Sequence, residues 1–170
     1  YDSSMIRNIM GYVFQNAYLF KGAIQDNLNL YDSSISMDTI IDATKKVKLH
    51  DMIESLPDGY QTSVGYLGSL LSDGQKQLLA FARTLIINRP ILLLDEATAN
   101  IDSHTESQIQ ESIETIRGEK TIINVAHRLS TVQKANRILV LSYGKIVEDG
   151  TFDELMQHKG DFYELWNHQK

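Results

Sequence analysis

Two adjacent carboxylates, Asp95 and Glu96, follow directly after the aliphatic run Ile-Leu-Leu-Leu at positions 91–94. A run without polar alternation is typical of a strand buried on both faces of a parallel sheet, so the two acids lie where this strand is expected to end. Asp95 could hold Mg²⁺ that bridges phosphate oxygens, and Glu96 could orient or deprotonate a water molecule. Strand ends also carry solvated acids without a function, and this pair alone leaves both interpretations open.

Polar residues follow two other predicted strands. Gln15 comes after the run Gly-Tyr-Val-Phe, and His127 comes after Thr-Ile-Ile-Asn-Val-Ala. Because ligands of open α/β sheets bind beyond the carboxyl ends of the strands, we expect Gln15, the acid pair and His127 to converge. A single histidine after a strand is more often structural than catalytic, so the functional interpretation of His127 depends on the order of the surrounding motifs.

The segment Leu-Leu-Ser-Asp-Gly-Gln at positions 70–75 can act as a helix cap or as an anion site. Ser72 with Gln75 three residues later forms a capping box, which contributes about 1 kcal/mol, and Gly74 suits a tight first turn. The free N–H groups of a helix start also favour phosphate through the helix dipole, by about 0.3 to 1 kcal/mol. Taken alone, the segment favours capping over phosphate binding.

The apolar periodicity divides the chain into a helical region and an α/β region. A short strand ending at Gln15 precedes a mostly helical region that extends to Arg89. Its last helix is predicted to begin at Ser72 and to end before Pro90, because proline cannot continue a helix. From residue 91 the pattern changes to strand, helix and strand, and this alternation predicts an α/β fold.

Turn and capping signals predict the remaining elements. The strands at 121–126 and 137–141 are expected to be buried like the strand at 91–94, with only minor polar breaks. Ser103 and Glu106 are expected to cap the helix between the first two of them. Tyr143-Gly144 predicts a hairpin at the edge of the sheet, followed by two closing helices. The residues expected to face inward are Ile40, Ile41, Val47, Leu78, Ala82, Leu85, Ile86, Ile109, Ile113 and Ile116.

The composition excludes several classes of protein. The formal net charge of -6, without a basic cluster, argues against non-specific nucleic-acid binding, which depends on clustered Lys and Arg. The absence of cysteine excludes disulfides and thiolate metal sites. The longest aliphatic run is far shorter than the roughly 18 to 20 residues that span a bilayer. These features predict one soluble domain, or a domain with a lobe.

The order of the motifs resembles the nucleotide-binding domain of ABC transporters. Gln15 after a strand, the sequence LSDGQ opening a helix, ILLLDEA, then NID, and His127 after the next strand occur in that family's order. The resemblance implies an α/β fold with a RecA-like parallel-sheet ATPase core, incomplete at its N-terminus, and an inserted α-helical subdomain. It divides the chain into a Q-loop strand segment at 1–21, the helical subdomain at 22–89 and the remaining core at 90–170.

The same resemblance implies a role for each motif residue, with ATP and Mg²⁺ as cofactors. Gln15 would be the Q-loop glutamine, which touches the metal and the attacking water. Asp95 would hold the metal, Glu96 would be the catalytic glutamate, and His127 would contact the γ-phosphate. Asp102 would end the D-loop. The signature motif that faces the partner's nucleotide would consist of Leu71, Ser72, Asp73, Gly74 and Gln75.

Further segments are similar to exporter-type domains. These are YLFKGAIQDNL, LPDGYQTSVGYLG, AHRLSTV and DEATANID. The implied partners are a second nucleotide-binding domain and a transmembrane domain, with the chain at the cytoplasmic face of the membrane and no nucleic acid. The alternatives are a soluble ABC-type ATPase and a non-catalytic regulatory module. Export of drugs, lipids or peptides is the implied function.

The sequence departs from the family pattern in three ways. No GxxxxGK[ST] phosphate loop occurs, so we expect a C-terminal fragment of a longer protein, with little or no ATPase activity by itself. Asp73 replaces a signature glycine, and its charge near a phosphate would cost on the order of a few kcal/mol unless it points to solvent. Tyr66 replaces a glutamate that is common in the exporter coupling loop.

Overall fold

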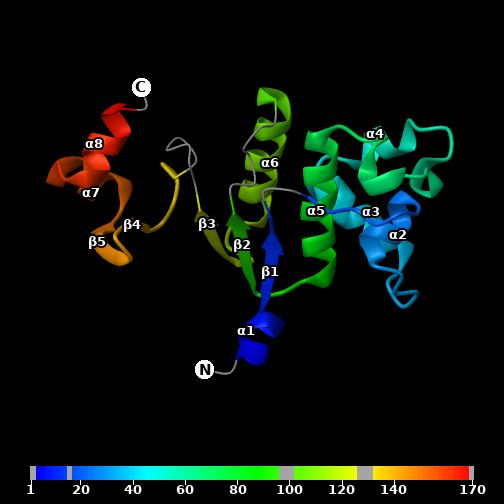
Figure 1. Ribbon diagram of the computed structural model, residues 1–170, viewed down its shortest axis with the longest axis horizontal. Helices are drawn as coiled ribbons and strands as arrows, with labels where there is room; N and C mark the ends of the chain where they lie inside the picture. Colours follow the sequence, from blue (N-terminus) through cyan, green and yellow to red (C-terminus); the bar gives the residue numbers. More distant parts are fainter. Residues whose placement is uncertain (1–2, 15–16, 96–101, 126–131, 169–170) are drawn as a thin grey trace. The chain divides into compact units, whose positions relative to one another are not determined.

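The computed structural model describes residues 3–14, 17–95, 102–125 and 132–168, and Figure 1 shows its elements along the chain. The chain divides into two compact units, Tyr1–Val125 and Ala126–Lys170. Each unit is described by itself below. The three-part division at residues 21 and 89 stays a prediction.

A three-stranded parallel sheet forms the centre of the first unit. Its order is β1-β2-β3, with β1 at Met10–Val13, β2 at Ile91–Asp95 and β3 at Thr121–Val125. Both pairs of neighbouring strands are parallel. Leu92 and Leu94 of the middle strand are each 1% exposed, whereas Ile91 and Leu93 on the opposite face are only partly buried. The expected burial of this strand on both faces is therefore confirmed for one face only. The predicted α/β fold is confirmed.

Helices and a buried apolar cluster cover the face of this sheet that carries Val13, Leu92 and Leu94. The helical region between β1 and β2 follows the apolar pattern, because Ile40, Val47 and Ile53 are fully buried. The inward face predicted for the last two helices is also confirmed, with Leu78 and Ile109 among the buried residues. The helices are α1 (Ser3–Ile9), α2 (Ile24–Asn29), α3 (Met37–Lys46), α4 (His50–Glu54), η1 (Gly59–Gln61), η2 (Tyr66–Gly68), α5 (Asp73–Ile87) and α6 (Ser103–Ile116).

The cap of α6 differs from the prediction. Asp102, not Ser103, is the N-cap residue, with extended backbone angles φ -65° and ψ 156°. Its carboxylate accepts hydrogen bonds from the Thr105 backbone N–H at 2.9 Å and from the Thr105 hydroxyl at 2.7 Å. A carboxylate accepts such bonds more strongly than a hydroxyl does and complements the positive end of the helix dipole. The helix therefore begins one residue earlier than the capping pattern predicted.

The expected burial of β3 is also wrong. Ile123 is 45% exposed and Val125 is 47% exposed. Within the described residues β3 pairs with β2 alone, so it is an edge strand here. An apolar run predicts burial of the strand but contains no information about how many neighbours the strand has.

The second unit is a hairpin packed against two helices. The strands β4 (Ile138–Ser142) and β5 (Lys145–Gly150) pair antiparallel, followed by α7 (Phe152–His158) and α8 (Asp161–His168). The predicted hairpin and closing helices are confirmed, but the expected position of the hairpin at the edge of the parallel sheet is not. Burial of β4 on both faces is wrong, because Val140 is 8% exposed and Leu141 is 67% exposed. Among the described residues the hairpin forms a two-stranded sheet of its own. The helices α7 and α8 pack against one face of this sheet.

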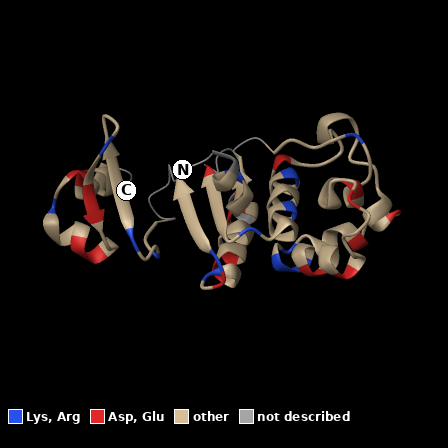
Figure 2. Cartoon of the chain, turned by 90° about the horizontal axis from the view of Figure 1, so that it is seen from below, with Lys and Arg blue, Asp and Glu red and all other residues tan. Residues whose placement is uncertain are grey.

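Opposite charges lie close together on the surface of the first unit. Figure 2 shows basic and acidic residues interspersed along the helices. Lys46 pairs with Asp42 at 3.3 Å, and Lys48 of the α3–α4 connection pairs with Glu111 of α6. Such exposed pairs contribute about 0 to 1 kcal/mol each. The apolar cluster, and not these pairs, therefore accounts for most of the stability of the unit.

Candidate functional site

The carboxyl ends of the three parallel strands lie at one edge of the sheet. Val13 at the end of β1 is in register with Leu94, and Asp95 at the end of β2 is in register with Val125 of β3. Leu94 is buried, whereas Asp95 directly after it is exposed. The buried strand therefore fixes the backbone of a carboxylate that is accessible to a ligand.

Three predicted site residues lie outside the described residues. These are Gln15, Glu96 and His127. Each follows the end of a strand in the sequence, two residues after Val13, one after Asp95 and two after Val125. Their proposed roles stay predictions.

The start of α5 carries the predicted capping box. Ser72 has extended backbone angles, and its hydroxyl accepts a hydrogen bond from the Gln75 backbone N–H at 3.1 Å. The Gln75 side chain accepts in return from the Ser72 backbone N–H at 2.9 Å. Leu71 before the cap is half-buried and packs against the apolar core. The box is confirmed, and it fixes the direction in which the first turn of α5 presents its N–H groups.

Asp73 points to solvent. Its side chain is 81% exposed, and its carboxylate pairs with the Lys76 ammonium one turn later at 3.0 Å. Solvent and the ammonium both reduce the field of the carboxylate, and the start of a helix is a favourable position for an acid. Lys76 and solvent thus offset part of the Asp73 charge at this helix start.

Gly74 brings the start of α5 against the start of α6. A Cβ atom at Gly74 would lie 2.6 Å from the Thr105 Oγ1 atom and 2.7 Å from its Cγ2 atom. The Thr105 hydroxyl is itself bonded to Asp102. Two separate motifs, at 71–75 and at Asp102, thus meet through Thr105, which the sequence gave no reason to select.

The donor chemistry at the sheet edge fits a magnesium nucleotide. Mg²⁺ is usually bound by one or two carboxylates together with water and substrate phosphates. Asp95 supplies one such carboxylate on a rigid strand, and among the described residues no cluster of three or more metal-ligating side chains suits an all-protein metal site. The 15-residue helix α5 offers backbone N–H groups for a phosphate.

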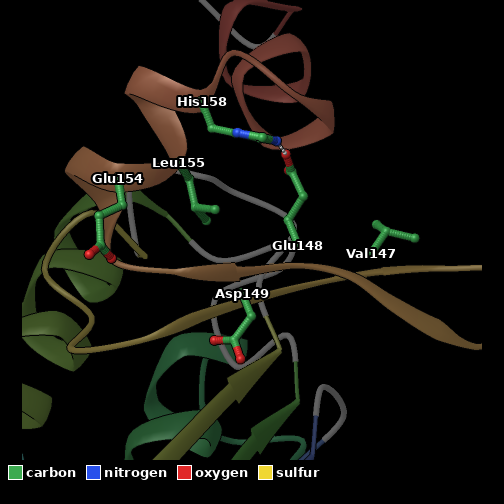
Figure 3. A pocket seen from close by; sticks show the side chains of 6 residues that line it. All are labelled: Val147, Glu148, Asp149, Glu154, Leu155 and His158. Carbon is green, nitrogen blue, oxygen red and sulfur yellow. Dashed lines mark ion pairs between the residues drawn. The ribbon is translucent and has the colours of Figure 1, made fainter.

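A separate hollow in the second unit has a structural explanation. It has a volume of about 410 Å³ and lies between β5 and α7, with the side chains shown in Figure 3. Arg137 binds Asp149 through two hydrogen bonds of 2.7 and 2.5 Å, which lower the pKa of that carboxyl group. Glu154 caps α7, where the Thr151 backbone N–H lowers its pKa. Glu148 accepts from the Phe162 backbone N–H at 2.6 Å. All three carboxylates thus serve the fold.

Replacing Ser72 by alanine is expected to destabilise the first turn of α5 by about 1 kcal/mol. The change removes the acceptor of the Gln75 N–H, which has no partner within the helix. Amide hydrogen exchange should be faster at the start of α5. The matched control is Ser33→Ala at an exposed loop position, which should leave exchange in α5 unchanged. Equal exchange in both variants would contradict a stabilising role for the box.

Comparison with known proteins agrees with the arrangement of these elements. Residues 1–99 match the family described as ABC transporter. The chain is 40% identical over 169 residues to the putative multidrug export ATP-binding/permease protein YgaD of Bacillus subtilis (strain 168), covering 99% of this chain and 29% of that protein. It is 40% identical over 166 residues to the ATP-dependent lipid A-core flippase of Syntrophus aciditrophicus (strain SB), covering 96% and 28%.

A solved structure is also similar. It is a bacterial Atm1-family ABC exporter with ATP bound, which superimposes with a TM-score of 0.89 at 38% identity and covers 98% of this chain and 29% of that one. The chain thus spans less than a third of the length of these relatives. No described helix has both the length and the apolar character needed to cross a membrane. On the matched family pattern and these identities, the chain belongs to the ABC transporter family.

Proposed function

We propose that this chain forms part of the ATP-hydrolysing domain of an ABC exporter and powers transport across a membrane. The observation that carries the proposal is the alignment of the strand ends, with Asp95 exposed at the edge where Gln15, Glu96 and His127 follow in the sequence. This edge is where open α/β sheets bind their ligands. The family membership and the names of the relatives support the same function.

Each motif residue has one task in this proposal. Asp95 holds Mg²⁺ and Glu96 takes a proton from the attacking water, so the two acids divide one hydrolytic task. Gln15 contacts the metal and this water, and His127 contacts the γ-phosphate. The bound metal supplies positive charge that stabilises the transferred phosphoryl group. The residues Leu71, Ser72, Asp73, Gly74, Gln75 and Asp102 face nucleotide that is held by a second such domain.

The proposal assigns the phosphate loop to sequence outside these 170 residues, because the GxxxxGK[ST] pattern does not occur in them. Phosphoryl transfer depends mainly on positioning of the phosphates, so the chain by itself is expected to hydrolyse little or no ATP. The partners are a second nucleotide-binding domain and a transmembrane domain, and the site of action is the cytoplasmic face of the membrane. Drugs, lipids or peptides are the proposed cargo.

The exposure of Asp73 favours the catalytic proposal over a regulatory module. A carboxylate forced against a phosphate would weaken the composite ATP site, whereas the Asp73 side chain is 81% exposed and paired with Lys76. The soluble ABC-type ATPases remain the less favoured alternative, because the interval from Gln15 to Leu71 leaves no room for a long coiled-coil insertion.

Purified intact transporter that contains this chain is expected to hydrolyse ATP in the presence of Mg²⁺. Turnover by wild type and by Asp73→Gly should agree within about fivefold, because an exposed ion pair contributes about 1 kcal/mol at most. Phosphate release would be measured with and without a chelator. Absence of both nucleotide binding and turnover in wild type would refute the proposed function. A large gain of turnover in Asp73→Gly would favour the regulatory alternative.

A further inference from the structure

Side chains of α5 hold the backbone on both sides of positions 15 and 16. The Gln77 amide donates a hydrogen bond from Nε2 to the Phe14 carbonyl oxygen at 3.0 Å. The Arg83 guanidinium donates from Nη1 to the Tyr18 carbonyl oxygen at 3.1 Å. Both partners lie more than 60 residues away in the sequence. The helix that begins with the signature residues therefore also binds the two described ends of the stretch that contains Gln15.

Gln77 occupies a position that an apolar residue would fill at lower cost. It is 2% exposed and lies four residues before Phe81 and one before Leu78, both of which belong to the apolar core. A buried amide is unfavourable unless it is hydrogen-bonded, and the bond that it makes here goes to the Phe14 backbone. The contribution of Gln77 is therefore the position of one particular carbonyl group.

Arg83 extends the same contact through a second side chain. Its Nε atom donates to the Asn27 carbonyl at 2.7 Å, and its Nη2 atom donates to the Asn27 side-chain oxygen at 3.2 Å. Asn27 is fully buried, and its side chain bonds both the backbone N–H of Phe20 at 2.8 Å and its carbonyl at 2.9 Å. The Arg83 guanidinium also lies 5.6 Å from the centre of the Phe20 ring. Arg83 thus contacts residues 18 and 20 directly, and Asn27 of α2 links Phe20 to Arg83 a second time.

The acceptors of Arg83 indicate that its main contribution is to hold several oxygen atoms in fixed positions. All three are uncharged carbonyl or amide oxygens, and burial lowers the pKa of this guanidinium group. A guanidinium presents its donors in a fixed planar fork, so it can reach backbone groups in different directions at once. A lysine at this position could keep the charge but could not reproduce the fork.

The first strand packs closely against α5. A Cβ atom at Gly11 of β1 would lie 2.5 Å from the Thr84 Cγ2 atom. The Thr84 hydroxyl also bonds the Tyr12 carbonyl at 3.2 Å. Together with the Gln77 bond, these contacts join β1 and the Phe14 carbonyl to α5.

We infer that Gln77 and Arg83 are positioning residues that transmit the position of the signature helix to the stretch that carries Gln15. The inference rests on the proposed function, in which Gln15 contacts the metal and the attacking water. A shift of α5 would then move the chain on both sides of Gln15. Neither residue contacts nucleotide in this scheme, and each acts on the rate through the backbone that it holds.

The test uses Gln77→Leu and Arg83→Lys in the intact transporter. Gln77→Leu keeps the approximate volume and removes the hydrogen bond to Phe14, and Arg83→Lys keeps the charge but loses the planar fork of donors. We expect kcat for ATP to fall about 10-fold with KM changed less than about twofold, because misplacement of a catalytic group lowers the rate and leaves ground-state binding intact. Ser112→Ala is the matched control, since Ser112 is fully buried and donates only within its own helix, to the Gln108 carbonyl at 2.6 Å. This control should keep the wild-type kcat.

Amide hydrogen exchange provides a readout that does not depend on ATP hydrolysis. Exchange at residues 17–20 should be faster in Gln77→Leu and Arg83→Lys than in wild type and in Ser112→Ala. The inference would be overturned if both variants kept the wild-type kcat, or if their kcat fell no further than that of Ser112→Ala. If wild type does not hydrolyse ATP, the proposed function fails by itself, and unchanged exchange at 17–20 would separately overturn the contact between α5 and this segment.

Discussion

Replacement of Glu96 by glutamine in the intact transporter is expected to lower ATP turnover by about 10²- to 10⁴-fold and to leave ATP binding unchanged. Glutamine keeps the shape of the side chain but cannot accept the proton of the attacking water. The adjacent Asp95, exposed at the end of a buried strand, would still hold the metal. The variant should therefore bind nucleotide and retain it. Turnover is measured by phosphate release, and binding by retention of labelled ATP.

Glu119→Gln is the matched control for this experiment. It makes the same chemical change at an exposed acid between α6 and β3, away from the carboxyl ends of the strands. We expect the control to keep wild-type turnover. If Glu96→Gln also hydrolyses ATP at a near-normal rate, the assignment of Glu96 as the general base is wrong. If Glu96→Gln binds no ATP, its role would instead be in holding the metal or nucleotide.

Local signals in the sequence were sufficient for much of the fold. The capping box of Ser72 and Gln75, the stop before Pro90 and the hairpin at Tyr143-Gly144 all depend on residues within one or two turns of each other. Their geometry in the structure agrees with the pattern. The strand β2 was predictable because four aliphatic residues without polar alternation have few alternatives to a core strand, although full burial is confined to the face of Leu92 and Leu94.

Three features of the structure were beyond the sequence pattern. Gln77 lies beside the apolar stripe of its helix, and nothing in the sequence identifies the Phe14 carbonyl as its partner. The cap of α6 shifted to Asp102 because its carboxylate competes better than the Ser103 hydroxyl expected there, and both residues fit the usual cap preference. The exposed face of β3 depends on which strands lie beside it. Local propensity cannot determine any of these three features.

A methyl group at Gly74 is expected to separate the start of α5 from the start of α6. In Gly74→Ala the new Cβ atom would lie within 3.0 Å of three Thr105 atoms, and the Thr105 hydroxyl cannot turn away without losing its bond to Asp102. Overpacking of this kind costs about 1 to 3 kcal/mol. If this whole free-energy cost adds to the activation barrier for ATP hydrolysis, turnover of the intact transporter falls roughly 5- to 150-fold.

Thr105→Ala provides the test of this explanation, because it removes the two nearest atoms and leaves only the Thr105 Cβ atom, at 3.0 Å. The double variant Gly74→Ala/Thr105→Ala should therefore turn over ATP faster than the sum of the two single effects predicts. A double-mutant cycle measures this coupling directly. Additive losses would mean that Gly74 is required for something other than its contact with Thr105, and close approach of its backbone to the partner's nucleotide would then be the better explanation. Coupling would instead show that the signature helix and the Asp102 turn act on the ATP site as one packed unit.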